Sequence, residues 1–244
     1  MFYLRPQRPP APAPTPEWPE LFGQLARSAR DYRLQRYYRA GAVEGDRPLG
    51  EVPFVALDVE TTGLDLRRDA IVSIGLVPFD LRRIRVRESA HWILNPHKPL
   101  AEESVVIHGI THSAVQEAPD LLLVLDELLC ALAGKVVVVH HRAIERGFLD
   151  RALRARLNEG IRFPVVDTMD LEARLHRRKP LGLWARLRGQ RPVSIRLADS
   201  RGRYHLPHYH PHHALTDALA TAELLQAQIL HHYGADTPLR AVWR

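Results

Sequence analysis

The chain has few of the residues that several classes of protein site require. Cys130 is the only cysteine among the 244 residues, so no intrachain disulfide, Cys-based zinc site or redox pair can form. We expect this lone cysteine to be a buried small residue. No segment approaches the run of about 20 apolar residues that a membrane helix needs, and the N-terminus has no apolar stretch of signal-peptide length. These absences predict a cytoplasmic protein without a membrane partner.

Positive charge, in contrast, is plentiful. The formal net charge is +6, so the surface should attract polyanions such as nucleic acid. The same charge also fits a solvated, arginine-rich surface with no such partner. A composition of 45% hydrophobic and 25% charged residues is ordinary for a globular protein with one sizeable core. We therefore expect one domain and an extension.

The extension lies at the N-terminus. Residues 1–19 are rich in proline, which favours extended conformations and predicts a flexible Pro-rich tail, either a bare linker or a docking segment. Residues 20–50 begin with a basic segment of helical spacing that ends at Gly41, followed by a polar linker. This helical extension can pack on the domain at 51–233, after which we expect a C-terminal tail at 234–244.

The order of apolar patterns predicts the fold class of the domain. Short apolar or alternating runs predict strands, the first three in a meander, at 53–59, 70–79, 84–94, 135–140 and 163–167. Helical periodicity predicts helices at 119–132, 144–157, 168–176 and 215–231. Strands that come first in a hairpin run and then alternate with helices imply an α/β domain, a mixed sheet covered by helices.

The segment LDVETTGLD places two carboxylates at the end of the first strand. Side chains two residues apart on a strand share a face, so Asp58 and Glu60 point the same way. Adjacent negative charges of this kind suit Mg²⁺ or Mn²⁺. The alternative, two solvated acids, fits poorly with the apolar residues before them. In the turn that follows, Thr61, Thr62 and Gly63 can expose backbone N–H groups to a terminal phosphate or sugar.

Two later segments add acids and histidines. In VVVVHHRAIERGFLD a buried strand leads to His140, and Glu145 follows on a helix, where it is either a third carboxylate opposite Asp58 or part of an exposed Glu-Arg pair. In PHHALTDALATAELL, His212 precedes an apolar helix and Asp217 lies in its first turns. An acid there is favoured by the helix dipole alone, but a neighbouring histidine can also accept a proton from a metal-bound water.

The histidines between 205 and 213 raise a rival hypothesis. Five of them crowd into this segment, which can indicate a zinc or nickel site. Their spacing follows no fixed ligand geometry, so we favour a loop whose histidines contact substrate.

Together, the three acidic segments resemble the DEDDh exonuclease family, which includes proofreading subunits of bacterial replicative polymerases and oligoribonucleases. The resemblance covers about 52–233 and includes SVVIHGIT at 104–111 and VVDTMDLEARL at 165–175. It implies a ribonuclease H-like fold with a mixed five-stranded sheet flanked by helices. It also implies a single-stranded DNA or RNA 3′ end as partner, DNA more than RNA, and a polymerase or other protein as a further partner.

The resemblance assigns roles to individual residues. Metal ligands are Asp58, Glu60, Asp217 and Glu145, and His212 is the general base. The implied reaction is hydrolysis of the last phosphodiester with two divalent cations, Mg²⁺ or Mn²⁺, about 4 Å apart, releasing a nucleoside 5′-monophosphate. Substrate contacts are implied for seven residues, namely Thr61, Thr62, Gly63, Leu64, His108, His140 and His141.

The second motif departs from the family pattern His-Asn-x-x-Phe-Asp. His141 and Ile144 replace the Asn and Phe, and Glu145 replaces the Asp with a side chain one methylene longer. Asp150 is another acid nearby, more than a helical turn further on. These departures keep two alternatives open. One is a nucleic-acid-binding or regulatory module with weakened catalysis, and the other is a nuclease for short oligoribonucleotides.

A strongly basic segment separates the last two motifs. Residues 175–204 interleave Arg and Lys with Trp184 and Tyr204, so they can follow the phosphates of a single strand while the aromatic rings stack on bases. A solvated surface excursion with Trp184 in the core explains the same residues equally well.

Overall fold

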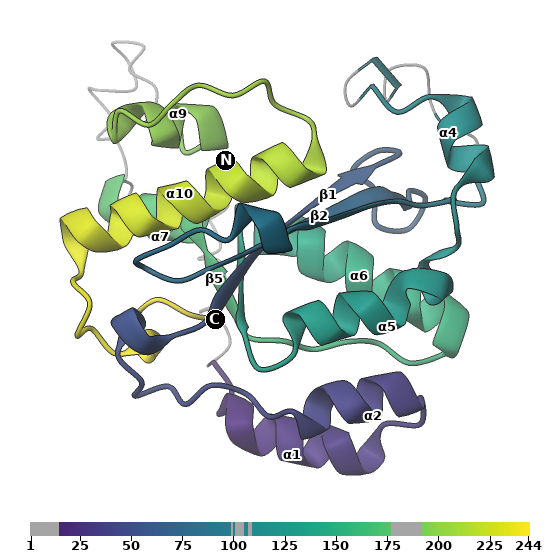
Figure 1. Cartoon of the computed structure of the whole chain (residues 1–244), viewed down its shortest axis with the longest axis horizontal. Coiled ribbons are helices and arrows are strands. Elements are labelled where there is room, and N and C mark those ends of the chain that lie inside the picture. Colours follow the sequence, from purple (N-terminus) through teal and green to yellow (C-terminus); the bar gives the residue numbers. More distant parts are fainter. Residues whose placement is uncertain (1–14, 99, 101–104, 107–108, 177–191) are drawn as a thin grey trace, which may run out of the picture.

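A mixed five-stranded sheet forms the centre of the molecule, as predicted (Figure 1). The computed structural model describes residues 15–98, 100, 105–106, 109–176 and 192–244. The sheet order is β3-β2-β1-β4-β5, with β1 antiparallel to β2, β2 antiparallel to β3, and β1, β4 and β5 parallel. The strands are β1 (Phe54–Thr61), β2 (Ile71–Phe79), β3 (Ala90–Ile93), β4 (Val136–Val139) and β5 (Val165–Asp167).

Helices cover both faces of this sheet (Figure 1). The parallel connections β1 to β4 and β4 to β5 place α5 (Leu121–Leu132) and α6 (Arg142–Leu157) on one face, because such crossovers are right-handed. The other face is covered by α10 (Ala214–His232), with α7 (Thr168–His176) beside it. No helix in the described part of the chain is long and apolar enough to cross a membrane.

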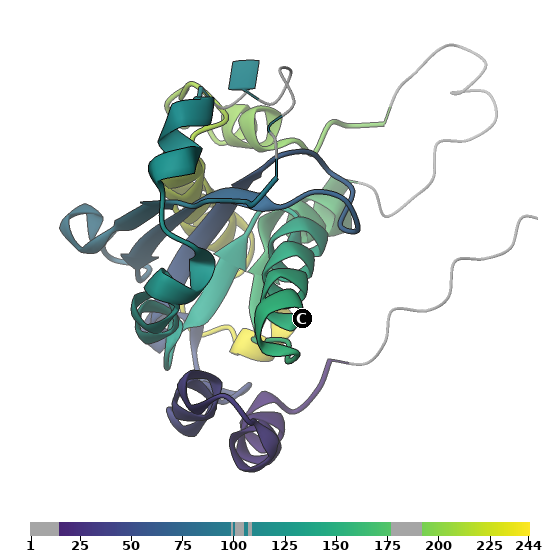
Figure 2. The same cartoon turned by 90° about the vertical axis from the view of Figure 1, so that its right-hand side faces the viewer.

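Two short helices were not predicted from the sequence. The first is α4 (His112–Glu117), and the second is α9 (Leu197–Arg203), which lies over α10 within the segment expected to be a basic excursion (Figures 1 and 2). The strand predicted at 84–94 is shorter in the structure, where only Ala90–Ile93 form β3. The Asp80 turn brings Ile84 back to bridge with Phe79, but residues 86–88 then form a 3₁₀ turn with Val86 56% exposed, so pairing with β2 resumes only at Ala90.

The N-terminal extension packs against the domain as two helices rather than one. Helix α1 (Trp18–Ser28) begins inside the segment expected to be a tail, and its Trp18 is fully buried. A break follows because Asp31 caps α2 (Tyr32–Arg39) by accepting the N–H of Arg33 at 2.9 Å. Residues 1–14 lie outside the described part.

The C-terminal residues belong to the folded domain, so the expected tail at 234–244 is wrong. Trp243 is 3% exposed and bridges to Val166 on β5. The backbone of Arg244 exchanges hydrogen bonds with Val165 at 2.7 and 3.2 Å, so this segment satisfies the outer edge of β5. Cys130 was also expected to be buried, but it is exposed on α5, where its Sγ contacts Arg36 at 3.4 Å.

A glycine on β2 determines how closely α10 approaches the sheet. A Cβ added at Gly75 would lie 2.3 Å from the backbone carbon of Ala214, the first residue of α10. No larger residue fits there, because backbone atoms of a buried helix cannot move aside cheaply. Gly75 also pairs with Asp58 on β1, so the start of α10 lies next to the acidic end of that strand.

We predict that Gly75→Ala lowers the free energy of unfolding by about 1–3 kcal/mol, the usual cost of forcing an extra carbon into a packed core. Urea unfolding followed by circular dichroism measures this. Gly23→Ala is the control, because its added Cβ lies 3.8 Å from only the flexible end of Arg27, and a helical Gly to Ala change stabilises by up to about 1 kcal/mol. Equal stability of Gly75→Ala and wild type would contradict the tight approach.

Candidate active site

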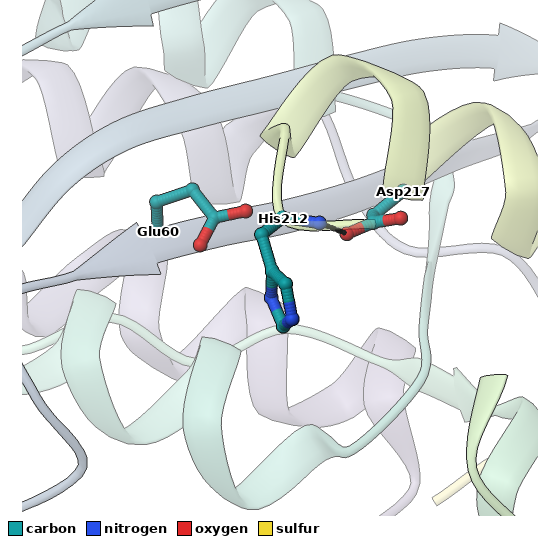
Figure 3. Close-up of side chains that lie close together, drawn as sticks. All are labelled: Glu60, His212 and Asp217. Atoms are coloured by element: carbon teal, nitrogen blue, oxygen red, sulfur yellow. Dashed lines mark hydrogen bonds between the residues drawn. The ribbon is translucent and has the colours of Figure 1, made fainter. Parts of the chain in front are cut away.

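The carboxylates from the first and last motifs meet where β1 and α10 converge. Asp58 and Glu60 lie opposite Gly75 and Ser73 of β2 and point toward the face that α10 covers. Glu60, His212 and Asp217 offer ligand atoms that all lie within 4.8 Å of one another, with His212 between the two acids (Figure 3). The strand register shifts between Glu60 and Thr61, an irregularity that is common where a strand directs side chains into a site.

The loop before α10 fixes Asp217 through the backbone of His212. The N–H of His212 donates to Oδ2 of Asp217 at 2.8 Å (Figure 3). His212 has a φ of 70°, a left-handed conformation that costs a non-glycine residue about 1–3 kcal/mol. The side chain of His212 is exposed, and no hydrogen bond joins its ring to the rest of the described structure. Its imidazole therefore has nitrogen atoms free for chemistry.

Glu145 provides a further carboxylate from α6. Its side chain is 3% exposed, and its Oε2 has no hydrogen-bond partner among the described residues. Burial raises the pKa of Asp58 well above its usual range, and the negative charge of Glu145 adds to the effect. Neither carboxylate belongs to the group formed by Glu60, His212 and Asp217, so Asp58 and Glu145 lie beside that group. Asp150 faces elsewhere, since it accepts the N–H of Ile161 at 3.0 Å.

Burial raises the pKa of each of the four acids. It raises the pKa of Glu60 to about 7, with repulsion from Asp217 adding to the shift. It also raises the pKa of Glu145 and of Asp217, the latter against the opposing N–H bond from His212. Buried carboxylates that repel one another and include an unpartnered oxygen form a donor set for a hard divalent cation. The residues present therefore fit a metal site.

The Thr-Thr-Gly turn is held mainly by bonds within the protein. The N–H of Thr62 donates to the carbonyl of Ala70 at 2.9 Å, and its hydroxyl bonds to Asp69 at 3.0 Å. A Cβ on Gly63 would lie 2.5 Å from the same Asp69 carboxylate, which accounts for the glycine. The predicted exposure of backbone N–H groups therefore does not extend to Thr62. Leu64 is 77% exposed, and Thr61 is partly buried.

The histidines of the second motif differ in environment. His140 is buried, with Nδ1 bonded to the Thr168 hydroxyl at 2.7 Å and Nε2 to the carbonyl of Ile195 at 3.0 Å. Burial lowers the pKa of His140 to about 4, so this ring is neutral and ties β4 to the segment before α9. His141 is exposed beside the acids. His108, the remaining predicted contact, lies outside the described residues.

The rival histidine site is not assembled. Within the described residues, Glu60, His212 and Asp217 form the one group of three or more candidate ligands. Tyr204 is engaged within the protein, since its hydroxyl donates to Glu172 at 2.8 Å and its ring lies 5.4 and 5.8 Å from the rings of His231 and His232, centroid to centroid. Trp184 lies outside the described residues.

Sequence reasoning missed several residues around the acids. Asp167 accepts the N–H groups of Arg142, at the start of α6, and of Met169, in the first turn of α7, so one carboxylate serves two helix ends. Ser73 and His91 bond to each other at 2.8 Å in a cleft of about 250 Å³ that also borders Glu60 and His212. Strand alternation was the available signal, because Gly75 pairs with both Asp58 and His91 and so places them on one face.

Comparison with known proteins identifies the family. The RNase_T model, described as "Exonuclease", matches residues 55–225. The chain belongs to this exonuclease family. It is 33% identical over 128 residues to the PolC-type DNA polymerase III of Oceanobacillus iheyensis and 32% identical over 126 residues to that of Bacillus subtilis. These matches cover 52% and 51% of this chain but 9% of each relative. The chain therefore spans a small part of their length.

Solved structures of other exonucleases share the fold of the family. Exonuclease X in complex with 5′ overhanging duplex DNA has a TM-score of 0.56 at 21% identity, covering 76% of this chain and 97% of that one. The nuclease domain of 3′hExo, described as a DEDDh family member bound to rAMP, has a TM-score of 0.59 at 14% identity, covering 76% and 94%. The family resemblance and the fold class predicted from the sequence are thus confirmed.

We predict that Glu145→Gln stabilises the metal-free protein and weakens its stabilisation by divalent cations. A carboxyl whose folded pKa is raised contributes stability at low pH that is lost as pH rises through the folded value. In EDTA, wild-type stability should therefore fall from about pH 4.5 toward pH 7 and above, less steeply in the variant. Thermal melts across this range, with and without Mn²⁺, measure both effects. An equal Mn²⁺ shift in both proteins would exclude Glu145 as a ligand.

Proposed function

We propose that this chain hydrolyses the last phosphodiester at the 3′ end of single-stranded DNA and releases nucleoside 5′-monophosphates. The observation that carries the proposal is the convergence of ligand atoms of Glu60, Asp217 and His212 within 4.8 Å, beside the partly buried Asp58 and the buried Glu145. Membership of the exonuclease family supports the reaction class. DNA is proposed over RNA because the relatives quoted above are DNA polymerases by name.

The four carboxylates, Asp58, Glu60, Glu145 and Asp217, would hold Mg²⁺ or Mn²⁺. When bound, such cations make a water molecule more acidic and neutralise charge on the phosphate. His212 accepts the proton of the attacking water at its imidazole, and its exposed ring returns that proton to solvent. Asp217 keeps its position through the N–H of His212, so the base and one ligand are fixed together.

The central test compares wild type with Asp58→Asn on 5′-labelled DNA, RNA and dinucleotides in Mn²⁺, with products resolved at single-nucleotide length. We expect stepwise shortening of the DNA strand by wild type and at least a 100-fold slower rate for the variant, with strand binding retained, because the substitution removes a carboxylate that the cations need. Equal inactivity of both proteins that still bind strands would instead support a binding module. Activity confined to dinucleotides and very short RNA would support an oligoribonucleotide nuclease.

His212→Ala tests the general base. We expect a loss of about 10²–10⁴-fold in turnover near pH 7, the usual contribution of a positioned base, with partial recovery at higher pH where hydroxide becomes available. Rate profiles from pH 6 to 10 on one DNA substrate measure this. A loss of the same size at every pH would show that His212 positions the substrate without accepting a proton.

A further inference from the structure

A cleft of about 530 Å³ adjoins the acids on the side of α9. Asp58 and Glu145 border its inner end, and its walls include the apolar side chains of Ile144, Met169 and Leu197. This volume lies within the range of about 300–1,000 Å³ that is usual for small-ligand sites. When its carboxylates hold a divalent cation, such an end attracts a phosphate, and the apolar walls suit a flat apolar surface. A ligand with both features is a nucleotide.

The α9 wall of this cleft is held in place by buried polar contacts. Arg201 is 3% exposed and donates to the carbonyls of Ala220 at 2.6 Å and Pro207 at 2.8 Å. It also pairs with Glu223 at 2.7 Å, while the bond from His140 to the Ile195 carbonyl fixes the segment before α9. The wall is therefore formed before a ligand binds, which reduces the entropy cost of binding.

Arg196 places a positive charge at the rim of the cleft. It precedes α9 and is exposed, and its guanidinium pairs with no carboxylate in the described part of the chain. An unpaired guanidinium has forked donors that match phosphate oxygens. The apolar wall and the cation therefore occupy adjacent positions, as a base and its neighbouring phosphate do in a strand.

The position of Glu145 indicates which nucleotide enters, given the proposed function. Attacking and departing oxygens lie in line on opposite sides of the phosphorus. His212 borders both the smaller cleft and the α9 cleft, and the water from which it accepts a proton lies beside Glu60 and Asp217, whose ligand atoms lie within 4.8 Å of that of His212. Glu145 lies outside that group and borders the α9 cleft but not the smaller one, so the departing oxygen, which lies opposite the water, faces the α9 cleft. The nucleotide that keeps that oxygen is the penultimate one.

We propose that the α9 cleft binds the base of the penultimate nucleotide against Leu197 and Met169, and that Arg196 pairs with the phosphate on the 5′ side of that nucleotide. The inference rests on the proposed function and extends it to substrate recognition. A base can enter such a cleft only when it is unpaired and unstacked. The cleft therefore selects ends with at least two unpaired nucleotides.

Modified oligonucleotides test the base contact. An abasic residue at the penultimate position should lower wild-type kcat/KM roughly tenfold, the order expected for one base contact. In Leu197→Ala most of this penalty should disappear, whereas an abasic residue at the terminal position should affect both proteins equally. The assignment would be overturned if the penultimate abasic residue lowered kcat/KM equally in wild type and Leu197→Ala. It would also be overturned if Leu197→Ala removed the effect of an abasic residue at the terminal position.

The phosphate contact is tested with Arg196→Gln, a surface change that leaves the fold intact. A neutral methylphosphonate on the 5′ side of the penultimate nucleotide should weaken wild type severalfold and leave Arg196→Gln unaffected. Arg27→Gln, on α1 at the opposite end of the molecule, is the matched control and should behave as wild type (Figure 1). If the losses caused by the methylphosphonate and by Arg196→Gln add up when both are present, the Arg196 contact is overturned. Failure of wild type to shorten the unmodified strand would overturn the proposed function itself.

Discussion

The close contact between α10 and β2 at Gly75 organises the site. Because no Cβ separates the helix from the strand, Asp217 in the first turns of α10 lies beside the acids at the end of β1. The chain gathers its negative charges through backbone packing, even though the charges repel one another. The free energy of that packing offsets a repulsion that would otherwise drive the carboxylates into solvent.

Because packing holds the repelling carboxylates together, their pKa values are raised. Burial raises the pKa of Asp58, Glu60, Glu145 and Asp217 together, a pattern that stabilises a fold only if something neutralises the group. Glu145 shows it most clearly, with a buried oxygen that lacks a described partner. Such a cost to stability at one location is characteristic of functional sites.

Much of the fold and the acidic set could be predicted from the sequence, because both follow from local periodicity. Strand alternation placed Asp58 and Glu60 on one face, and helical spacing located α10 and therefore Asp217. The missed features depend on distant partners. Nothing local marks Arg201 as a buried anchor or Trp243 as the residue that covers β5. His140 shows the same limit, because its two bonds reach Thr168 and Ile195, far along the chain.

The shared cap at Asp167 links two parts of the molecule mechanically. One carboxylate binds the first N–H groups of both α6 and α7, so neither helix can slide along its axis without disturbing the other. Glu145 is in the first turn of α6, and Met169 of the α9 cleft is in the first turn of α7. A shift of Met169 in the apolar wall would thus be transmitted through Asp167 to α6. It would change the position of the Glu145 carboxylate relative to the other acids.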